Sequence, residues 1–166
     1  MEQTVMRELL RGKGAHADVL ACVEGVSLEI AGRQVPGFPQ SIYGVVWHAA
    51  YWMHYEVARI EGQSPRYPDH ADASWPSQPA PESEAEWAKT VAHFRAGIAA
   101  LDALAALPGD QAERKVALTS GTTNQGGNVK DIVWQTLVHN SYHIGQVVLL
   151  RQALGAWPPA SGTDSW

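Results

Sequence analysis

Three long segments with helical periodicity constrain the fold more than any other feature of this sequence. In each of them apolar residues recur every three or four positions, the pattern of a helix that buries one face. Each is followed by glycine or by a proline–glycine pair, the usual signals that end a helix. The segments cover residues 41–61, 82–107 and 129–154. With shorter helical stretches before them and little strand signal, they predict an all-α protein built as a helical bundle.

The rest of the chain divides into short helices and loops. Residues 62–81 contain five prolines and no periodicity, which predicts a long surface loop of the kind that is often functional. Residues 114–119 are expected to be extended, and the glycine-rich stretch after them is expected to be a turn that ends at Asn128, the N-cap of the last helix. Short helices are expected over 2–11, 15–25 and 27–32. On the 41–61 helix, the residues expected to point away from the apolar face are Tyr43, Gly44 and His54.

Length and composition exclude several classes of protein. The 166 residues fit one domain, 1–166, and 45% hydrophobic residues provide a core that a disordered chain lacks. A net charge of −5 without a basic cluster argues against nucleic-acid binding. No apolar run reaches the roughly 18 residues of a membrane span, and the N-terminus lacks a signal-peptide pattern, so a cytoplasmic protein is expected. The single cysteine, Cys22, excludes an internal disulfide and is expected to be a buried apolar residue.

Two histidines on the last predicted helix carry the strongest chemical signal. His139 and His143 are four residues apart and therefore share a face, with Cβ atoms about 5–6 Å apart. They fall on the core-facing stripe, where a buried imidazole needs a partner. Spacing alone leaves two interpretations about equal: a shared metal ion, or two core histidines with hydrogen bonds to protein groups. Asn140 stands where an HExxH protease has its glutamate, which argues against that class.

Two histidines seldom hold a catalytic metal alone, so a third ligand is expected elsewhere in the chain. His48 is the best candidate, near the edge of the apolar face of the 41–61 helix. The remaining histidines have simpler interpretations. His16 is expected to cap or bond locally, with a contact to a ligand histidine as the alternative, while solvent-exposed or structural positions are expected for His54, His70 and His93.

Several polar and aromatic residues near these histidines have both a structural and a functional interpretation. Glu56 lies on the core face two turns after His48. It is interpreted either as a general base or, more simply, as the partner of Arg59 in an ion pair. Gln135 and Gln146 flank the histidine pair, either orienting a ring or facing solvent. Glu56 and Gln146 are the catalytic candidates. Aromatic residues that can line a pocket, or simply belong to the core, are Trp47, Trp52, Tyr55 and Tyr142.

Two stretches, SIYGVVWHAAYW (41–52) and HNSYHIGQVVLLRQALGAWPP (139–159), resemble the DinB/YfiT-like superfamily of metal-dependent enzymes. The resemblance covers nearly the whole chain. It implies a four-helix bundle with a long crossover connection, usually as a homodimer. It also implies one divalent metal ion, zinc or nickel with manganese or iron as alternatives, held by His48, His139 and His143 with coordination positions left open. Gly145-Gln146 matches the pair that often follows the histidines in this superfamily.

The resemblance to bacillithiol- and mycothiol-dependent relatives favours thiol transfer to a small electrophile. The substrate would be a small molecule, with a low-molecular-weight thiol as a second substrate. Hydrolysis of a small molecule by a metal-activated water is the alternative reaction, since an ion with neutral imidazole ligands and an open position can activate either nucleophile. Two further hypotheses are a metal-binding stress-response protein without turnover and a metal-free helical scaffold.

Overall fold

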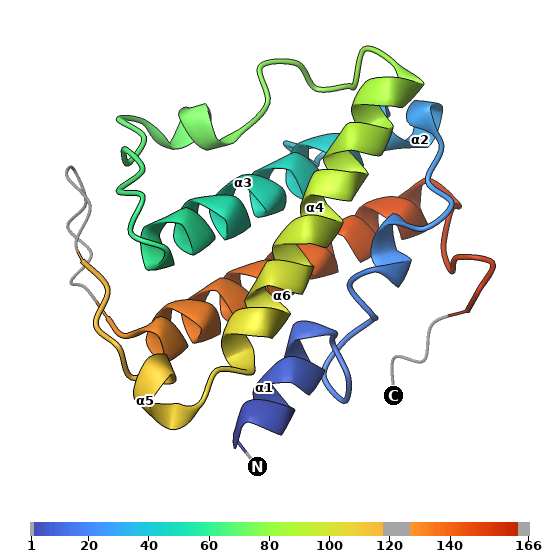
Figure 1. The fold of residues 1–166 in the computed structure, drawn as a ribbon. Coiled ribbons are helices and arrows are strands. Elements are labelled where there is room, and N and C mark those ends of the chain that lie inside the picture. Colours follow the sequence, from blue (N-terminus) through green and yellow to red (C-terminus); the bar gives the residue numbers. More distant parts are fainter. Residues whose placement is uncertain (1, 118–126, 163–166) are drawn as a thin grey trace.

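The structure is a computed structural model that describes residues 2–117 and 127–162 (Figure 1). Four longer helices form its frame, and two short α-helices and two 3-10 turns lie between them. The longer helices are α1 (Glu2–Leu10), α3 (Ile42–Ile60), α4 (Glu84–Ala105) and α6 (Val129–Ala153). The short elements are η1 (Ala21–Val23), α2 (Leu28–Gly32), η2 (Ala71–Ser74) and α5 (Gly109–Ala112).

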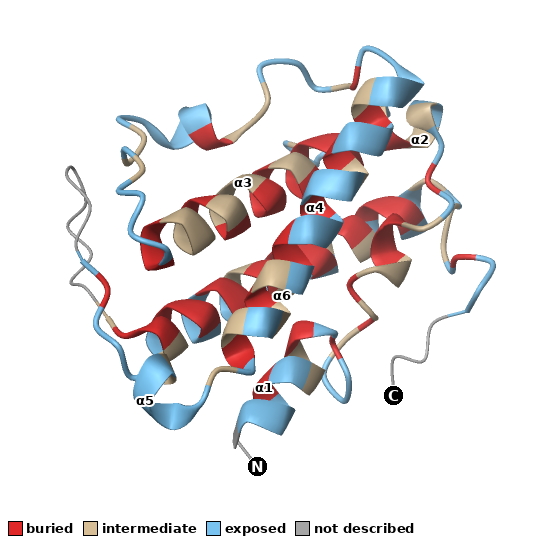
Figure 2. Cartoon of the chain, in the orientation of Figure 1, coloured by how far each residue is buried: buried red, intermediate tan, exposed pale blue. Residues whose placement is uncertain are grey.

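The four longer helices pack around one hydrophobic core. Helix α3 lies against both α4 and α6, and α1 closes the other side by packing on α4 and α6. The buried faces of these helices turn toward one another, as the colouring of Figure 2 shows. Phe94, Met53 and Leu101 are almost completely removed from solvent at the centre. The predicted all-α bundle is therefore confirmed, with hydrophobic burial between helices as its main stabilising force.

Side-chain caps fix where the three longest helices begin. Ser41, Ser83 and Asn128 each accept a hydrogen bond from the backbone N–H three residues further on, at 3.1, 3.2 and 2.8 Å. Asn128 and Asp131 form a reciprocal capping box at the start of α6. These bonds satisfy N–H groups that have no partner within the helix, so the predicted starts of all three helices agree with the structure within two residues.

A long crossover joins α3 to α4 and allows the two helices to begin at the same end of the bundle. Residues 61–83 leave the C-terminal end of α3 and return along it before α4 starts (Figure 1). The hydroxyl of Ser41 donates to the carbonyl of Pro79 and ties the end of this segment to the first turn of α3. The segment predicted as a proline-rich loop is thus a strap across α3, interrupted only by the single turn η2.

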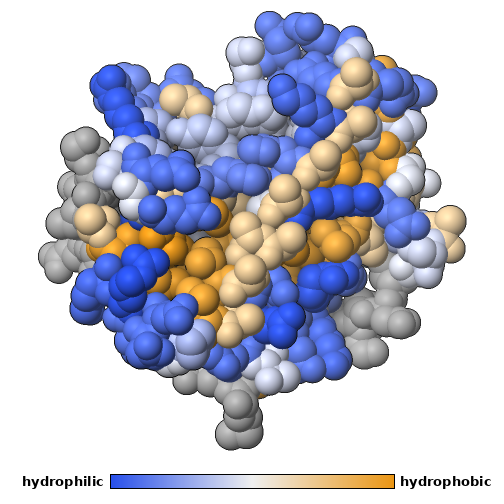
Figure 3. Space-filling model, in the orientation of Figure 1, coloured by the Kyte–Doolittle hydropathy of each residue, from blue (hydrophilic) through white to orange (hydrophobic). Residues whose placement is uncertain are grey.

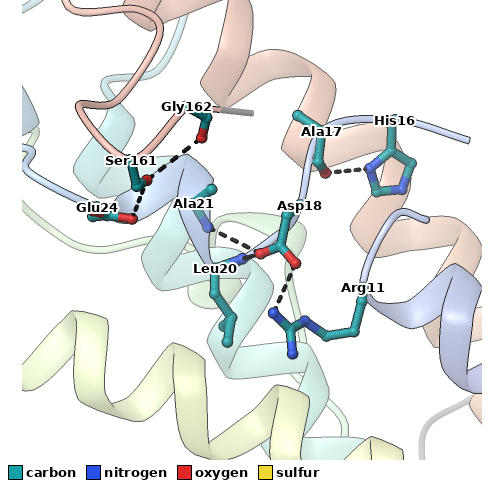
Figure 4. Close-up of polar contacts among 9 residues, drawn as sticks. All are labelled: Arg11, His16, Ala17, Asp18, Leu20, Ala21, Glu24, Ser161 and Gly162. Carbon is teal, nitrogen blue, oxygen red and sulfur yellow. Dashed lines mark hydrogen bonds and ion pairs between the residues drawn. The ribbon is translucent and has the colours of Figure 1, made fainter. Parts of the chain in front are cut away.

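Two expectations about the helices were wrong. Residues 15–25 form a turn followed by η1 because Asp18 accepts hydrogen bonds from the N–H groups of Leu20 and Ala21, at 2.8 and 3.1 Å (Figure 4). Tyr43 is 3% exposed rather than pointing to solvent, and its hydroxyl donates to Glu86 on α4 at 2.8 Å. Gly44 is also buried. Helix α3 is covered on more sides than one apolar face suggests.

The expected extended segment is reduced to one bridge in the part of the chain that the structure describes. Lys115 pairs with Asn128 in an isolated antiparallel bridge. Residues 118–119, and 120–126 of the glycine-rich turn, lie outside the described residues. The bridge brings residue 115 to the first turn of α6, where Glu113 accepts a hydrogen bond from the Asn128 amide at 2.6 Å.

A stripe of alanines runs along the outward face of α4. Figure 3 shows it as a pale ridge across the molecule. Its exposed alanines recur at three- and four-residue spacing and are Ala85, Ala88, Ala92, Ala96, Ala99 and Ala103.

Within the described ranges, no helix combines the length and the hydropathy that crossing a membrane requires.

Candidate metal centre

Three histidines from two helices converge beneath the crossover. His48 comes from α3, and His139 and His143 come from consecutive turns of α6. One ring nitrogen from each lies within 4.8 Å of the others. The ring centroids of His48 lie 5.3 Å from His139 and 4.7 Å from His143, and the two rings of α6 are 4.4 Å apart. The structure thus brings together the three residues that the sequence singled out.

Hydrogen bonds on the far side of two rings fix which nitrogen faces the centre. His48 donates from Nδ1 to the carbonyl of Ser74 at 2.8 Å, and His143 donates from Nδ1 to the side-chain oxygen of Gln146 at 2.7 Å. A proton on Nδ1 leaves the Nε2 lone pair of each ring free. An outer acceptor of this kind is the usual support of a metal-binding histidine.

The distances among the inner nitrogens suit a bound cation. Nε2 of His139 and Nε2 of His143 are 3.1 Å apart. Two nitrogens bound to one tetrahedral ion at 2.0–2.1 Å would be about 3.3 Å apart. Nδ1 of His139 is buried and has no hydrogen-bond partner within the described part of the chain. Three imidazole donors in this arrangement fit a divalent ion such as zinc or nickel.

Burial keeps these rings in the form that binds metals. Desolvation is the largest of the causes that lower the pKa of His48 and of His139 to about 4, and the neighbouring imidazoles contribute to the same shift. Burial also lowers the pKa of His143, although the Gln146 hydrogen bond opposes this. The rings are therefore neutral near pH 7, and neutral imidazole is the ligand form.

The crossover supplies one wall of the centre. Trp75 stacks face to face on His48, with ring centroids 3.8 Å apart and planes 9° apart, and its ring lies 6.0 Å from that of His143. Trp52, one turn after His48 on α3, meets the same imidazole edge-on at 6.4 Å. Two indoles thus limit the approach of water to His48 from two directions.

A cavity of about 290 Å³ opens beside the histidines and shares His139 with them. Trp52, Glu56 and Arg59 of α3 line it on one side. The predicted ion pair is present: Arg59 Nη1 lies 3.3 Å from Glu56 Oε2, and the side chains are only 6% and 13% exposed. Burial nonetheless raises the pKa of Glu56, against the opposing effect of Arg59. Gln135 is exposed at the rim of this cavity.

The other histidines lie outside the cluster. His54, expected to be solvated, stacks on His93 with ring centroids 3.6 Å apart and donates from Nε2 to the His93 carbonyl at 2.9 Å. His16 bonds locally to the carbonyl of Ala17 (Figure 4) and through Nε2 to the Ser141 hydroxyl at 3.0 Å. Neither of these bonds reaches His48, His139 or His143. His70 is exposed.

The aromatic candidates divide between two places. Trp52 lines the cavity beside the histidines, and Tyr55 packs on it with ring centroids 5.2 Å apart. Trp47 instead lines a separate cavity of about 380 Å³ between α3 and α4. Tyr142 is 68% exposed, although its ring lies 5.1 Å from that of His143.

Sequence reasoning missed the contribution of the crossover. Ser74, which accepts from His48, and Trp75, which stacks on it, are 26 and 27 residues from that histidine. Tyr67, from the same segment, lines the side cavity. The available signal was a tryptophan and a tyrosine within a proline-rich loop, where exposed aromatic residues would be unusual.

An all-α bundle with this three-histidine group defines the DinB/YfiT-like class of proteins. Residues 8–156 match the model of one family of that class, described as mycothiol-S-transferase. The chain therefore belongs to the mycothiol-S-transferase family. No curated protein and no solved structure matches the chain significantly.

Proposed function

We propose that this protein is a metal-dependent enzyme that transfers the sulfur of a low-molecular-weight thiol to a small electrophile. One divalent ion would be held by His48, His139 and His143. The convergence of three imidazole nitrogens within 4.8 Å carries the proposal. Membership of the mycothiol-S-transferase family supports thiol transfer over the alternative hydrolysis.

The reaction needs a nucleophilic sulfur at neutral pH. A divalent ion at the three histidines would lower the pKa of a thiol and hold it as the thiolate. The sulfur then forms a bond to a carbon of the electrophile while the bond from that carbon to its leaving group breaks. The leaving group departs with the electron pair, and the proton lost from the thiol is released to solvent.

The residues around the centre would prepare it for this chemistry. The Ser74 carbonyl and the Gln146 amide hold protons on the outer nitrogens of His48 and His143, so that both rings present lone pairs inward. Trp75 and Trp52 keep water from the His48 side. Three protein ligands leave positions for a substrate, whereas structural zinc sites usually have four. Zinc or nickel are the first candidates for the ion, with manganese or iron next.

Metal content and thiol dependence test the proposal. Protein purified without a histidine tag is analysed by inductively coupled plasma mass spectrometry beside His139→Ala and a control, His54→Ala, which removes a histidine outside the cluster. About one ion per chain in the wild type and control, lost in His139→Ala, is expected. Consumption of an electrophile such as a chlorinated nitrobenzene should then require both metal and mycothiol. Metal-dependent turnover without thiol would favour the hydrolase, and absence of metal after reconstitution would refute the proposal.

A homodimer is part of the proposal and is supported by the exposed face of α6. Residues 132–150 contain no charged side chain, yet four large apolar residues of this stretch are 48–68% exposed: Trp134, Val138, Tyr142 and Leu149. Depletion of charge around exposed aromatic residues is typical of interfaces. Gly145 lies on the same face, with open space where a Cβ would be.

The spacing along this face suits a second copy of the same chain. In an antiparallel pair centred between Ser141 and Tyr142, Trp134 faces Leu149 of the other copy and Val138 faces Gly145. Both pairings use the same centre, as a two-fold axis requires. The gap at Gly145 would receive Val138.

A single domain, a cytoplasmic location and a role without nucleic acid complete the proposal and remain predictions.

A further inference from the structure

The hydrogen bond between the two histidines of α6 has only one possible donor. His143 donates from Nδ1 to the side-chain oxygen of Gln146 at 2.7 Å, so its neutral ring has no proton on Nε2. This Nε2 nevertheless forms a hydrogen bond of 3.1 Å with Nε2 of His139. The shared proton therefore belongs to Nε2 of His139. A neutral imidazole carries one proton, which leaves a lone pair on Nδ1 of that ring.

Two neighbouring buried groups lack the partners that they need. Nδ1 of His139 has no hydrogen-bond partner among the described residues, and neither has the amide nitrogen or the amide oxygen of Asn140, which is 3% exposed. Burial is the main influence on the pKa of His139 and lowers it, whereas the Asn140 amide acts in the opposite direction, which places the two side chains within reach of each other. Because unpaired buried polar groups are costly, these two are expected to pair.

An amide can pair with this ring nitrogen in either tautomer of the imidazole. Its nitrogen donates to a lone pair, and its oxygen accepts from an N–H group. The two ends have nearly the same size, so a half-turn about the last side-chain bond exchanges them without extra space. When Nε2 of His139 is a metal ligand, the proton of the ring has to be on Nδ1, and an outer acceptor is then required.

We propose that Asn140 is a positioning residue for His139, with an amide that reverses when a metal ion binds. In the metal-free protein the amide nitrogen donates to Nδ1. In the metal-bound protein the amide oxygen accepts the proton of Nδ1. The ring loses the proton on Nε2 to solvent and gains one on Nδ1 from solvent, so its charge is unchanged.

This role distinguishes His139 from the other two rings of the group. His48 and His143 have their protons on Nδ1 without a metal ion, and acceptors with one fixed orientation are sufficient for them. The inference rests on the proposed function only in requiring that a divalent ion binds the three histidines.

Nitrogen-15 NMR of the imidazoles tests the tautomers in the complete chain, because protonated and unprotonated ring nitrogens differ widely in chemical shift. Spectra are recorded near pH 7 without metal and with one equivalent of zinc, and His139→Ala identifies the signals of that ring. The proton of His139 should be on Nε2 without metal and on Nδ1 with zinc. His48 and His143 should have it on Nδ1 in both samples.

Three variants measure what the amide contributes. Asn140→Leu keeps the approximate size but removes both hydrogen-bonding ends, so the zinc Kd measured with a competing chelator should rise by about tenfold or more. Asn140→Asp can accept but not donate, so it should place the proton of His139 on Nδ1 even without metal and bind zinc at least as tightly as the wild type. Thr90→Val, the matched control, removes another buried hydrogen-bonding group, on α4, and should change neither measurement. Thermal melts establish that each variant is folded.

The outcomes separate this role from a structural one and from the proposed function. If Asn140 only fills the core, folded Asn140→Leu should bind zinc within twofold of wild type, which would overturn the inference. A proton on the same nitrogen of His139 with and without zinc would also overturn it, as would a wild type that binds no zinc. If zinc binding depends on Asn140 but no sulfur is transferred, the role of Asn140 stands and the proposed activity fails. If sulfur is transferred but Asn140→Leu changes nothing, the reverse holds.

Discussion

Replacing Gln146 by leucine should weaken metal binding without altering the bundle. Its side-chain oxygen accepts the Nδ1 proton of His143 at 2.7 Å. Without that acceptor the imidazole is free to rotate and to move its proton to Nε2, which removes the lone pair that faces the centre. Loss of such an outer hydrogen bond typically costs 10- to 100-fold in metal affinity, or about 1.4–2.8 kcal/mol.

Competition with a chromophoric chelator measures this change directly. The zinc Kd of Gln146→Leu is compared with that of Gln152→Leu, which replaces an exposed glutamine six residues later on the same helix. Gln146→Glu should retain or increase affinity, since a carboxylate is a stronger acceptor for the same proton. A Kd for Gln146→Leu within twofold of wild type, in a folded variant, would refute the role assigned to this hydrogen bond.

Three further predictions concern the core, the free thiol and the α6 face. Phe94→Ala, at a fully buried position, should lower the unfolding free energy by about 3–5 kcal/mol and Tm by roughly 10 °C, measured by thermal melting. Burial raises the pKa of Cys22 to about 12, so the native state keeps a proton that the unfolded state loses above pH 9. Through this group the free energy of unfolding should fall by about 2 kcal/mol between pH 8.5 and 10.5. Denaturant titrations of Cys22→Ala over this pH range should show a correspondingly shallower decline. Val138→Glu should reduce the mass in light scattering from twice the 18.0 kDa of one chain to a single chain, and a wild type that is already monomeric would contradict the proposed dimer.

The sequence predicted the three-histidine group to the extent that its members share one helix. His139 and His143 are one turn apart on α6, so their proximity follows from helix spacing alone. His48 lies on another helix, and its position near an apolar edge gave only a candidate. The packing of α3 against α6 brings it within reach, and the family resemblance had anticipated that packing.

Which residues of a helix are buried was harder to predict where neighbouring elements cover the helix on more than one face. Tyr43 lies off the main apolar stripe of α3, yet α4 covers it and Glu86 accepts its hydroxyl proton. Local competition defeated another prediction: Asp18 bonds the N–H groups that a helix over 15–25 would have used. Both cases depend on side-chain hydrogen bonds whose partners the apolar periodicity does not encode.

The crossover shows why composition alone could not describe the candidate site. Its five prolines correctly predicted an irregular segment, because proline lacks the N–H that regular helices and sheets require. The same irregularity frees the Ser74 carbonyl to accept from His48 and places Trp75 against that ring. A regular helix would have used this carbonyl internally. The crossover is therefore a third element of the candidate site: it orients the histidine that α3 provides, while α6 provides the other two histidines.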